Sequence, residues 1–314
     1  ARRAGPVCMV ALILLAAAAP WIAPRPPELQ EHVAGARYLP PLTRAHALRI
    51  DPFHLRIVTS LRATQEGWEY SRGGRRESVR RIEVLGEPSS RFYLLGTDQL
   101  GRDLVSRLLY GTRHSLGIAA LSVALALAVG VGVGAVAGLA QRGVGATVLW
   151  GVDVVRAVPR LLLYILCASL FSPSTLLLVL VLGLTTWTSL ARLVRSQMLA
   201  LKEGGLATAA RALGASRSRT FLRHLMPQIA PLLVVSAALR FADTVLLESA
   251  LSLIGLGSPP PAVSLGGVMA SGRSALADAW WITVWPGLIL CAAVMALRSG
   301  AAELSRFSDP PSLV

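Results

Sequence analysis

The sequence predicts an all-α polytopic membrane protein with six transmembrane helices. Hydrophobic residues make up 54% of its 314 residues and the mean hydropathy is +0.57, which is too apolar for an ordinary soluble domain. Six apolar runs are each long enough to cross the hydrocarbon core of a bilayer. In chain order they cover residues 7–23, 114–140, 146–170, 175–199, 227–256 and 280–297.

The net charge of +14 does not indicate a nucleic-acid-binding protein. The 31 Lys and Arg residues outnumber 17 Asp and Glu residues, but they flank and separate the apolar runs instead of forming one patch. Orientation in a membrane explains this distribution better, and no nucleic-acid partner is expected. Cys8, Cys167 and Cys291 lie inside apolar runs without metal-ligand spacing, so we expect neither a disulfide framework nor a metal site.

The first apolar run, within residues 1–23, allows two interpretations. It follows Arg2 and Arg3 and ends in alanines, a pattern shared with secretory signal peptides. Because the rest of the chain is itself polytopic, we favour a retained membrane anchor.

Residues 24–113 form a long insertion between the first two runs, and we expect a small domain within it. Trp68 and Tyr70 alternate with polar neighbours, Gly73-Gly74 provides a turn, and residues 81–84 alternate again. This pattern predicts a β-hairpin. The insertion is expected to be extracytoplasmic and to end in a helix that lies along the membrane interface.

The orientation follows from the loop between the fourth and fifth runs. Between Arg192 and Pro227 there are seven cations and one acid, Glu203, so this loop is expected to face the cytoplasm. Both termini are then cytoplasmic, including the tail at 300–314. The five-helix core spans 114–299 and carries the loop at 200–227.

Residues 95–116 precede and enter the second run and carry a distinctive polar motif. Its carboxylates, Asp98 and Asp103, lie beside cations, and this favours helix capping and ion pairing over catalysis or calcium binding. Leu104 and Leu108 lie opposite the arginines, as expected of an interfacial helix. The candidate residues of this interfacial motif are Gly96, Thr97, Asp98, Gly101, Arg102, Asp103 and Arg107.

The second run is rich in glycine, which suits close helix packing in lipid. Charged residues also occur within the runs, where they are costly unless they are paired or face water. They either line a polar pathway or form ion pairs that fix helix packing. For Asp153 with Arg156, three residues apart, we favour an ion pair, and for Glu248 both interpretations stay open. The candidates are Asp153, Arg156, Arg240, Asp243 and Glu248.

The cytoplasmic loop predicts a helix-turn-helix segment. Ala209 and Ala210 favour helix, Gly214 offers a stop, Ser216 is a candidate cap for a helix over 217–225, and Pro227 suits the first turn of the next span. A partner that docks on this segment explains its place between apolar runs. The alternative is a basic juxtamembrane helix held by anionic lipid.

This segment resembles the EAA loop of ABC-transporter permeases, which binds the ATPase subunit. Ala209, Ala210, Gly214 and Pro227 are in register with the family pattern, whereas Thr208 replaces its glutamate. Met226 also stands where leucine is usual. The resemblance implies ATPase coupling by Thr208, Ala209, Ala210, Arg211, Gly214, Arg223, His224 and Pro227.

Further motifs resemble the C-type permease of dipeptide, oligopeptide and nickel importers. They are Gly-Thr-Asp-x-x-Gly-Arg-Asp from Gly96, Val152–Pro159, Glu248–Gly257, Trp280–Gly287 and Asp309-Pro310. The resemblance covers residues 92 to 314. It implies a multi-pass inner-membrane permease subunit, with a second homologous permease, two ATPase subunits, an external substrate-binding protein and the lipid bilayer as partners.

The chain itself is expected to hold no cofactor and no catalytic residue. Its single lysine, Lys202, is followed by Glu203, so no phosphate-binding P-loop exists and ATP and Mg belong to the partner ATPases. The alternative is an ATP-independent secondary transporter or channel that uses Asp153, Asp243 and Glu248 as a relay.

Overall fold

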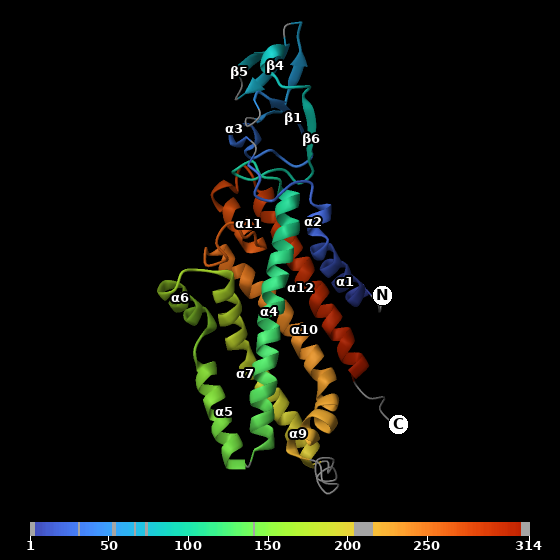
Figure 1. Ribbon diagram of the computed structural model, residues 1–314, viewed down its shortest axis with the longest axis vertical. Helices are drawn as coiled ribbons and strands as arrows, with labels where there is room; N and C mark the ends of the chain where they lie inside the picture. The colour runs from blue at the N-terminus through green and yellow to red at the C-terminus, as the bar shows by residue number, and fades with distance from the viewer. Residues whose placement is uncertain are drawn as a thin grey trace.

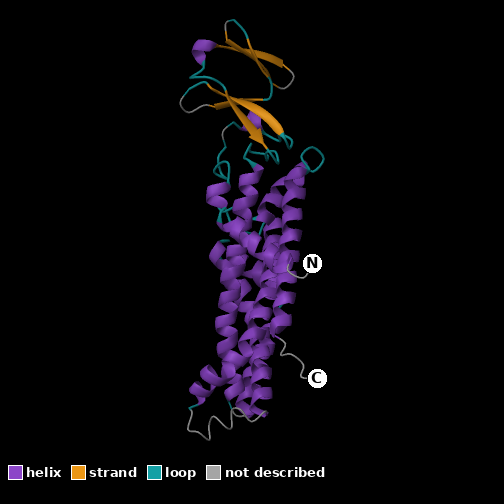
Figure 2. Ribbon diagram, turned by 90° about the vertical axis from the view of Figure 1, so that its right-hand side faces the viewer, coloured by secondary structure: helices purple, strands orange, loops and turns teal. Residues whose placement is uncertain are grey.

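A bundle of long helices carries a small β region at one end (Figures 1 and 2). This computed structural model describes residues 4–30, 32–51, 55–65, 67–72, 75–140, 142–203 and 216–308. The helices are α1 (Ala4–Ala17), α2 (Ala19–Ile22), α3 (Val33–Ala36), α4 (Leu104–Leu139), α5 (Arg142–Ala157), α6 (Arg160–Leu170), α7 (Thr175–Glu203), α9 (Arg217–Thr220), α10 (Met226–Leu253), α11 (Leu265–Gly272) and α12 (Trp281–Ser308). A π-helical turn, Phe221–Leu225, joins α9 to α10, and a 3-10 turn, Arg273–Ala275, follows α11.

Four of the described helices are long and apolar enough to cross a membrane. They are Leu104–Leu139, Thr175–Lys202, Phe221–Leu253 and Trp281–Ser305. The first and third predicted runs give shorter helices. The first forms α1 and α2, and α1 packs beside α12 in Figure 1. The other two predicted spans, over residues 7–23 and 146–170, therefore stay a prediction.

The predicted single helix over 146–170 is wrong, because the run is divided at Pro159. Helix α5 ends at Ala157, and Pro159 is the N-cap of α6. Proline has no amide proton to donate within a helix, and it disfavours helical geometry in the preceding residue, here Val158. The two resulting helices have 16 and 11 residues.

The predicted separate interfacial helix before the second run is also wrong. Residues 104–139 form one helix of 36 residues, α4, whose length of about 54 Å exceeds the thickness of a hydrocarbon core. Leu104 and Leu108 are buried in the bundle core together with Trp281 and Ile282 of α12, so the apolar face at the start of α4 packs on protein. The sequence between Leu104 and Leu139 contains no proline that would break the helix.

Two three-stranded antiparallel sheets form the β region. The first has the order β2 (Leu55–Val58), β1 (Thr43–Arg49), β6 (Ser89–Tyr93), and the second has the order β3 (Leu61–Ala63), β4 (Gly67–Arg72), β5 (Arg75–Arg80). Apolar side chains between the sheets form one cluster, Leu48, Val58, Tyr70, Val79 and Val84. The first sheet also packs on the segment that contains α3, through Ala36, Leu39, Ala45, Ile57 and Tyr93.

Strands β4 and β5 pair as a hairpin, with Trp68 opposite Val79 and Tyr70 opposite Glu77. The second strand of this hairpin differs from the predicted one. It ends at Arg80, and Arg81–Glu83 is a 3-10 turn where the alternation predicted a strand. The Glu83 carboxylate accepts a hydrogen bond from the Arg80 amide at 3.4 Å, which favours the turn over strand pairing.

Glycines on α4 allow α7 to approach closely. Gly130, Gly134 and Gly138 recur every four residues and face Leu190, Ala191, Val194 and Met198 of α7. A Cβ added at Gly134 would lie 2.6 Å from the carbonyl oxygen of Ala191. By contrast, a Cβ at Gly132 would have no neighbour within 4 Å. The glycine-rich run thus provides a helix-packing face.

Asp103 begins α4, and its replacement by alanine is expected to destabilise the start of this helix. The carboxylate accepts hydrogen bonds from the Ser106 amide and the Ser106 hydroxyl, both at 2.8 Å. Loss of such a cap typically costs about 1 kcal/mol. Asp103→Ala should therefore lower the apparent melting temperature of the purified protein in detergent, whereas Asp103→Asn, which keeps a capping oxygen, should lower it less. Equal melting of both variants and the unchanged chain would contradict this role.

Candidate functional site

Part of the predicted coupling segment lies outside the described residues, namely Thr208, Ala209, Ala210, Arg211 and Gly214. The described part begins at Ser216, whose hydroxyl accepts a hydrogen bond from the Arg219 amide at 3.3 Å. From there the chain runs through α9 and the π-helical turn into α10 without a break at Pro227. This end of the bundle lies opposite the β region (Figure 1).

The remaining predicted coupling residues present a mixed surface at that end. Arg223 and Pro227 are exposed and His224 is half-buried. Leu222 beside them is 66% exposed, so the segment also presents an apolar side chain at its surface. By contrast, Leu225 is buried against α7 in a cluster with Met198 and Val194. The segment is therefore anchored on the bundle by one side and offers the other side for a contact.

Asp153 pairs with a residue of another helix, so the predicted pairing of Asp153 with Arg156 is wrong. Asp153 of α5 pairs with Arg192 of α7, and Arg156 is exposed. The three-residue spacing puts Asp153 and Arg156 on one side of α5, but the long Arg192 side chain reaches that side from the neighbouring helix.

Asp243, like Asp153, pairs with a residue of another helix. Arg240 is half-buried, and Asp243, three residues later on α10, accepts a hydrogen bond from Arg298 of α12 at 2.7 Å. Asp243 and Arg298 are 57% and 55% exposed, so this ion pair lies at the surface of the described chain. It joins α10 to α12.

Glu248 is fully buried in α10 and has hydroxyl partners on its own helix. The carboxylate accepts a hydrogen bond from Ser252 at 2.7 Å and a longer one from Ser249 at 3.4 Å. Ser252 lies one turn away, a partner that the sequence analysis missed. Asp153, Asp243 and Glu248 thus have different partners on different helices, and no described contact joins them into the relay that the alternative function requires.

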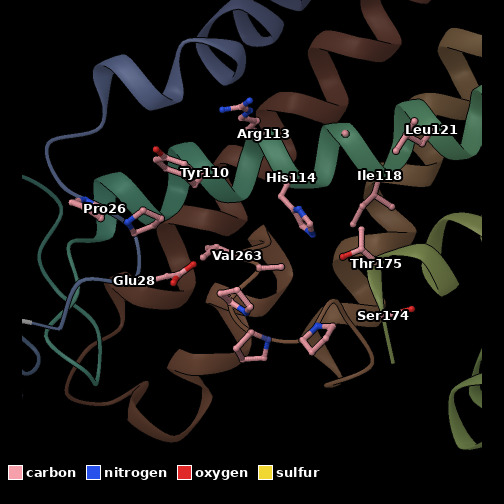
Figure 3. A pocket seen from close by; sticks show the side chains of 16 residues that line it. Pro26, Glu28, Tyr110, Arg113, His114, Ile118, Leu121, Ser174, Thr175 and Val263 are labelled. Carbon is pink, nitrogen blue, oxygen red and sulfur yellow. The ribbon is translucent and has the colours of Figure 1, made fainter. Parts of the chain in front are cut away.

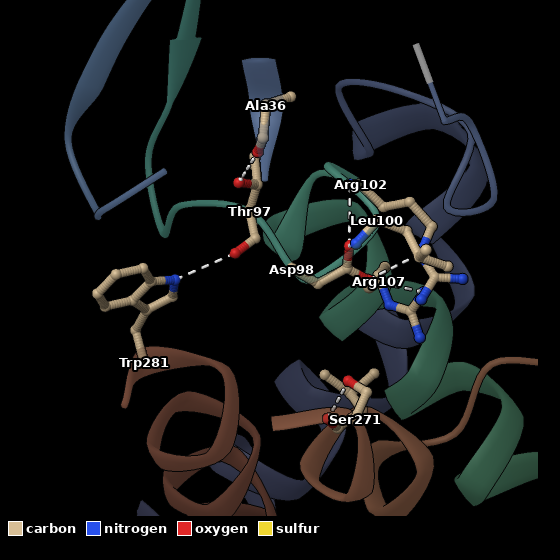
Figure 4. Close-up of polar contacts among 9 residues, drawn as sticks. Ala36, Thr97, Asp98, Leu100, Arg102, Arg107, Ser271 and Trp281 are labelled. Atoms are coloured by element: carbon tan, nitrogen blue, oxygen red, sulfur yellow. Dashed lines mark hydrogen bonds and ion pairs between the residues drawn. The ribbon is translucent and has the colours of Figure 1, made fainter. Parts of the chain in front are cut away.

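A polar junction fixes the β region to the start of α4 (Figure 4). Asp98 is fully buried and accepts hydrogen bonds from the Leu100 amide at 2.8 Å, the Arg102 amide at 3.0 Å and Arg102 Nε at 2.7 Å. Arg107 Nη1 of α4 lies 3.1 Å from the same carboxylate. These contacts place Asp98, Arg102 and Arg107 in one cluster, as the predicted ion pairing requires.

Thr97 connects this cluster to two distant segments, around residues 36–39 and at Trp281. Its hydroxyl donates to the Ala36 carbonyl and accepts from the Leu39 amide at 2.8 Å. Its own carbonyl accepts a hydrogen bond from Trp281 Nε1 of α12 at 3.2 Å (Figure 4). Gly96 and Gly101 have φ angles of +85° and +71°, in the left-handed region where glycine is favoured. The whole predicted motif, from Gly96 to Arg107, is therefore one structural joint.

The segment after α2 joins the same region. Arg25 places its guanidinium 4.3 Å from the centre of the Tyr93 ring, and its amide donates to the Ser106 hydroxyl at 3.1 Å. Burial raises the pKa of the Tyr93 hydroxyl, and the positive charges of Arg25 and Arg91 partly oppose this rise. Three stretches of chain, around residues 25, 37 and 97, thus meet at the start of α4.

A cavity of about 960 Å³ lies beside the first half of α4 (Figure 3). Pro259–Val263 of the loop between α10 and α11 forms one wall, and Tyr110 and His114 of α4 form another. His114 Nε2 lies 3.0 Å from the Ser258 hydroxyl, and Thr175 at the start of α7 donates to the same hydroxyl at 3.0 Å.

These contacts fix the loop to two helices. His114, Thr175 and Ser258 were not among the predicted site residues; the proline run after Ser258 was the available signal, since it marks a rigid non-helical loop. In the described part of the chain, no group of three or more His, Cys, Asp or Glu side chains is arranged to hold a metal ion.

The four long apolar helices indicate a multi-pass membrane protein, and comparison with known proteins identifies its family. Residues 130–304 match the family described as binding-protein-dependent transport system inner membrane component. This match covers more than half of the chain. The chain therefore belongs to this family, and it is an ABC-importer permease of the peptide type, a transport subunit and not a catalytic enzyme.

Two relatives illustrate the similarity. A peptide transport system permease protein of Brucella suis biovar 1 is 34% identical over 269 residues, which cover 86% of this chain and 89% of the relative. The di/tripeptide transport system permease protein of Pseudomonas aeruginosa is 33% identical over 218 residues, 69% of this chain and 72% of the relative.

A solved structure shares the fold. The inward-facing MetNI methionine ABC transporter contains a chain that matches with a TM-score of 0.54 and 20% identity. The match covers 66% of this chain and 98% of that chain. The helical core of this protein is thus an ABC permease fold.

Proposed function

We propose that this chain forms half of the translocation pathway of an ATP-driven importer of the dipeptide, oligopeptide or nickel class. A second, homologous permease supplies the other half, two ATPase subunits bind ATP and Mg, and an external protein delivers the substrate. The names of the relatives, which are peptide permeases, support the substrate class. The family description supports dependence on a binding protein.

The proposed orientation has six spans with both termini in the cytoplasm. In this orientation α1 with α2 forms the first span, α5 with α6 forms the third, and the four long helices form the others. The observation that carries this orientation is the separation in Figure 1 between the basic segment at α9 and the β region at the other end of the bundle. Short basic loops face the cytoplasm, so the β region, within 24–113, is the extracytoplasmic insertion.

The ATPases act on the segment from Thr208 to Pro227. Closure of the ATPases on nucleotide pushes this segment, and α10 carries the motion because α9, the π-helical turn and α10 are continuous. The push changes access to the pathway only if nucleotide favours one conformation over the other.

Replacement of Gly214 by tryptophan tests this coupling. We expect Gly214→Trp to reduce the amount of ATPase recovered with the tagged permease by about tenfold or more. The reason is that a bulky side chain would block close approach of the ATPase to the coupling segment. The measurement is co-purification of the complete complex from detergent, followed by ATP-dependent peptide uptake after reconstitution.

Gly143→Trp is the matched control. Gly143 is the second residue of α5, which begins at the same end of the bundle as α9 (Figure 1), and a Cβ added there has no neighbour within 4 Å. This variant should keep both ATPases and uptake. A stable particle that moves solute without any ATPase would refute the proposed function and support the secondary transporter.

A further inference from the structure

A second cavity, of about 790 Å³, shares the proline-rich loop with the cavity of Figure 3. Arg102 and Arg107 line it together with Gln30, and Ser264 and Ser271 contribute hydroxyl groups. The Pro259–Val263 loop and Glu28 line both cavities. Its volume falls within the range of about 300–1,000 Å³ that is usual for small-molecule sites.

Arg107 has hydrogen-bonding capacity that the polar junction does not use. Its side chain is only 7% exposed. Among the described residues, its Nε makes no hydrogen bond, and its Nη1 contacts Asp98 at 3.1 Å without hydrogen-bond alignment. In Figure 4 the guanidinium lies between Asp98 and the helix that carries Ser271. Buried guanidinium N–H groups without an acceptor are costly, so an acceptor in the cavity would stabilise this arrangement.

The charges at the cavity suit a ligand that carries both signs of charge. Arg102 and Arg107 share the Asp98 carboxylate, and the exposed Glu28 carboxylate also lines the cavity and acts electrostatically on Arg107. A planar carboxylate fits the two-pronged geometry of a guanidinium better than a spherical anion does.

We propose that this cavity binds the carboxylate of a small zwitterionic peptide, with Arg107 and Arg102 holding the carboxylate and Glu28 holding the ammonium group. The exposed Glu28 side chain is the acid that lines the cavity. The prolines of the loop offer an apolar wall to the peptide side chains. This inference rests on the proposed function, and it gives the permease its own contact with the transported peptide.

Equilibrium binding of radiolabelled Leu-Leu to the complete complex in nanodiscs, without the external binding protein, tests the proposal. We expect Leu-Leu to bind. Its C-terminal amide should bind at least about tenfold more weakly, because the neutral amide forms no ion pair with a guanidinium. Butyrate, which has a carboxylate and no ammonium group, should also bind more weakly. Equal binding of Leu-Leu and its amide, or no Leu-Leu binding at millimolar concentration, would overturn the assignment.

Variants at Gln30 and Glu28 leave the junction around Asp98 intact. Gln30→Glu adds a negative charge to the cavity and should weaken Leu-Leu binding, whereas the neutral control Gln30→Met should weaken it less. Glu28→Gln should weaken binding of Leu-Leu but strengthen that of N-acetyl-Leu-Leu, which lacks the ammonium group. The same direction of change for both peptides would refute the role of Glu28.

ATPase recovery and uptake, measured on the same preparations, test the proposed function separately. Loss of the ATPases with intact Leu-Leu binding would count against the importer alone. Retained ATPases and uptake without Leu-Leu binding to the permease would count against the cavity alone.

Discussion

Asp98→Asn is expected to lower the free energy of unfolding by about 3–5 kcal/mol, because it leaves two arginines beside a neutral amide. Asp98 is fully buried, and the side chains of Arg102 and Arg107 are only 15% and 7% exposed. Neither guanidinium can lose its proton at neutral pH, so each must be paired or leave the interior. Chemical denaturation of the purified chain in mixed micelles measures the change.

Glu77→Gln is the matched control for this prediction, since it also exchanges a carboxylate for its amide. Glu77 pairs with Arg56 in the β region at 3.7 Å, and the two side chains are 39% and 31% exposed. Ion pairs that water reaches contribute about 0–1 kcal/mol, so this variant should be close to the unchanged chain. If Asp98→Asn were as mild as Glu77→Gln, the junction would not depend on its buried charge.

The sequence predicted the contacts of this junction between residues close in the chain, but not those between distant segments. Asp98 and Asp103 beside arginines predicted ion pairing and capping, since both interactions join residues within one or two turns. The bonds from Thr97 to Ala36, Leu39 and Trp281 cross 58 to 184 residues. No periodicity in the sequence specifies which distant backbone groups meet, so this part required the structure.

The charges in the helices show the same limit. Spacing along one helix suggested that Asp153 pairs with Arg156, yet Asp153 pairs with Arg192 of α7. Which neighbouring helix supplies a partner depends on helix packing, which sequence periodicity does not encode. Ser252, in contrast, lies four residues after Glu248 and was within reach of the same local reasoning.

Helix boundaries were predictable where a residue has a strong backbone preference. Pro159, which divides α5 from α6, was the available signal for the boundary that the predicted single helix over 146–170 lacked. The continuity of α4 was not predicted, because polar residues near Asp103 suggested a separate interfacial helix. Burial of Arg107 in the junction removes the reason for that helix to lie on a membrane surface.

Gly134→Leu is expected to destabilise the protein by about 3 kcal/mol, near the upper end of the range for overpacked cores. The added Cβ would lie 2.6 Å from the Ala191 carbonyl oxygen and 2.7 Å from Val194 Cβ, both on α7. Because the first contact is with backbone, no side-chain rotation relieves it, and α4 and α7 must separate. Small residues at such positions allow the van der Waals packing that joins helices in membranes. Denaturation in mixed micelles measures the loss.

Gly132→Leu tests whether packing or helix propensity is responsible. Gly132 lies two residues away on the same helix and, unlike Gly134, faces open space. Leucine favours helix over glycine at both positions, so propensity alone predicts that both variants are stabilised. Close packing predicts opposite outcomes, with Gly132→Leu within about 0.5 kcal/mol of the unchanged chain or slightly more stable. Gly130 lies one turn before Gly134 and also meets backbone of α7, the Trp187 carbonyl oxygen at 2.9 Å, so Gly130→Leu should resemble Gly134→Leu. Gly138, one turn after Gly134, meets only the flexible Met198 side chain, so Gly138→Leu should be milder. A loss of stability that did not follow this four-residue period would show that glycine has another role in α4.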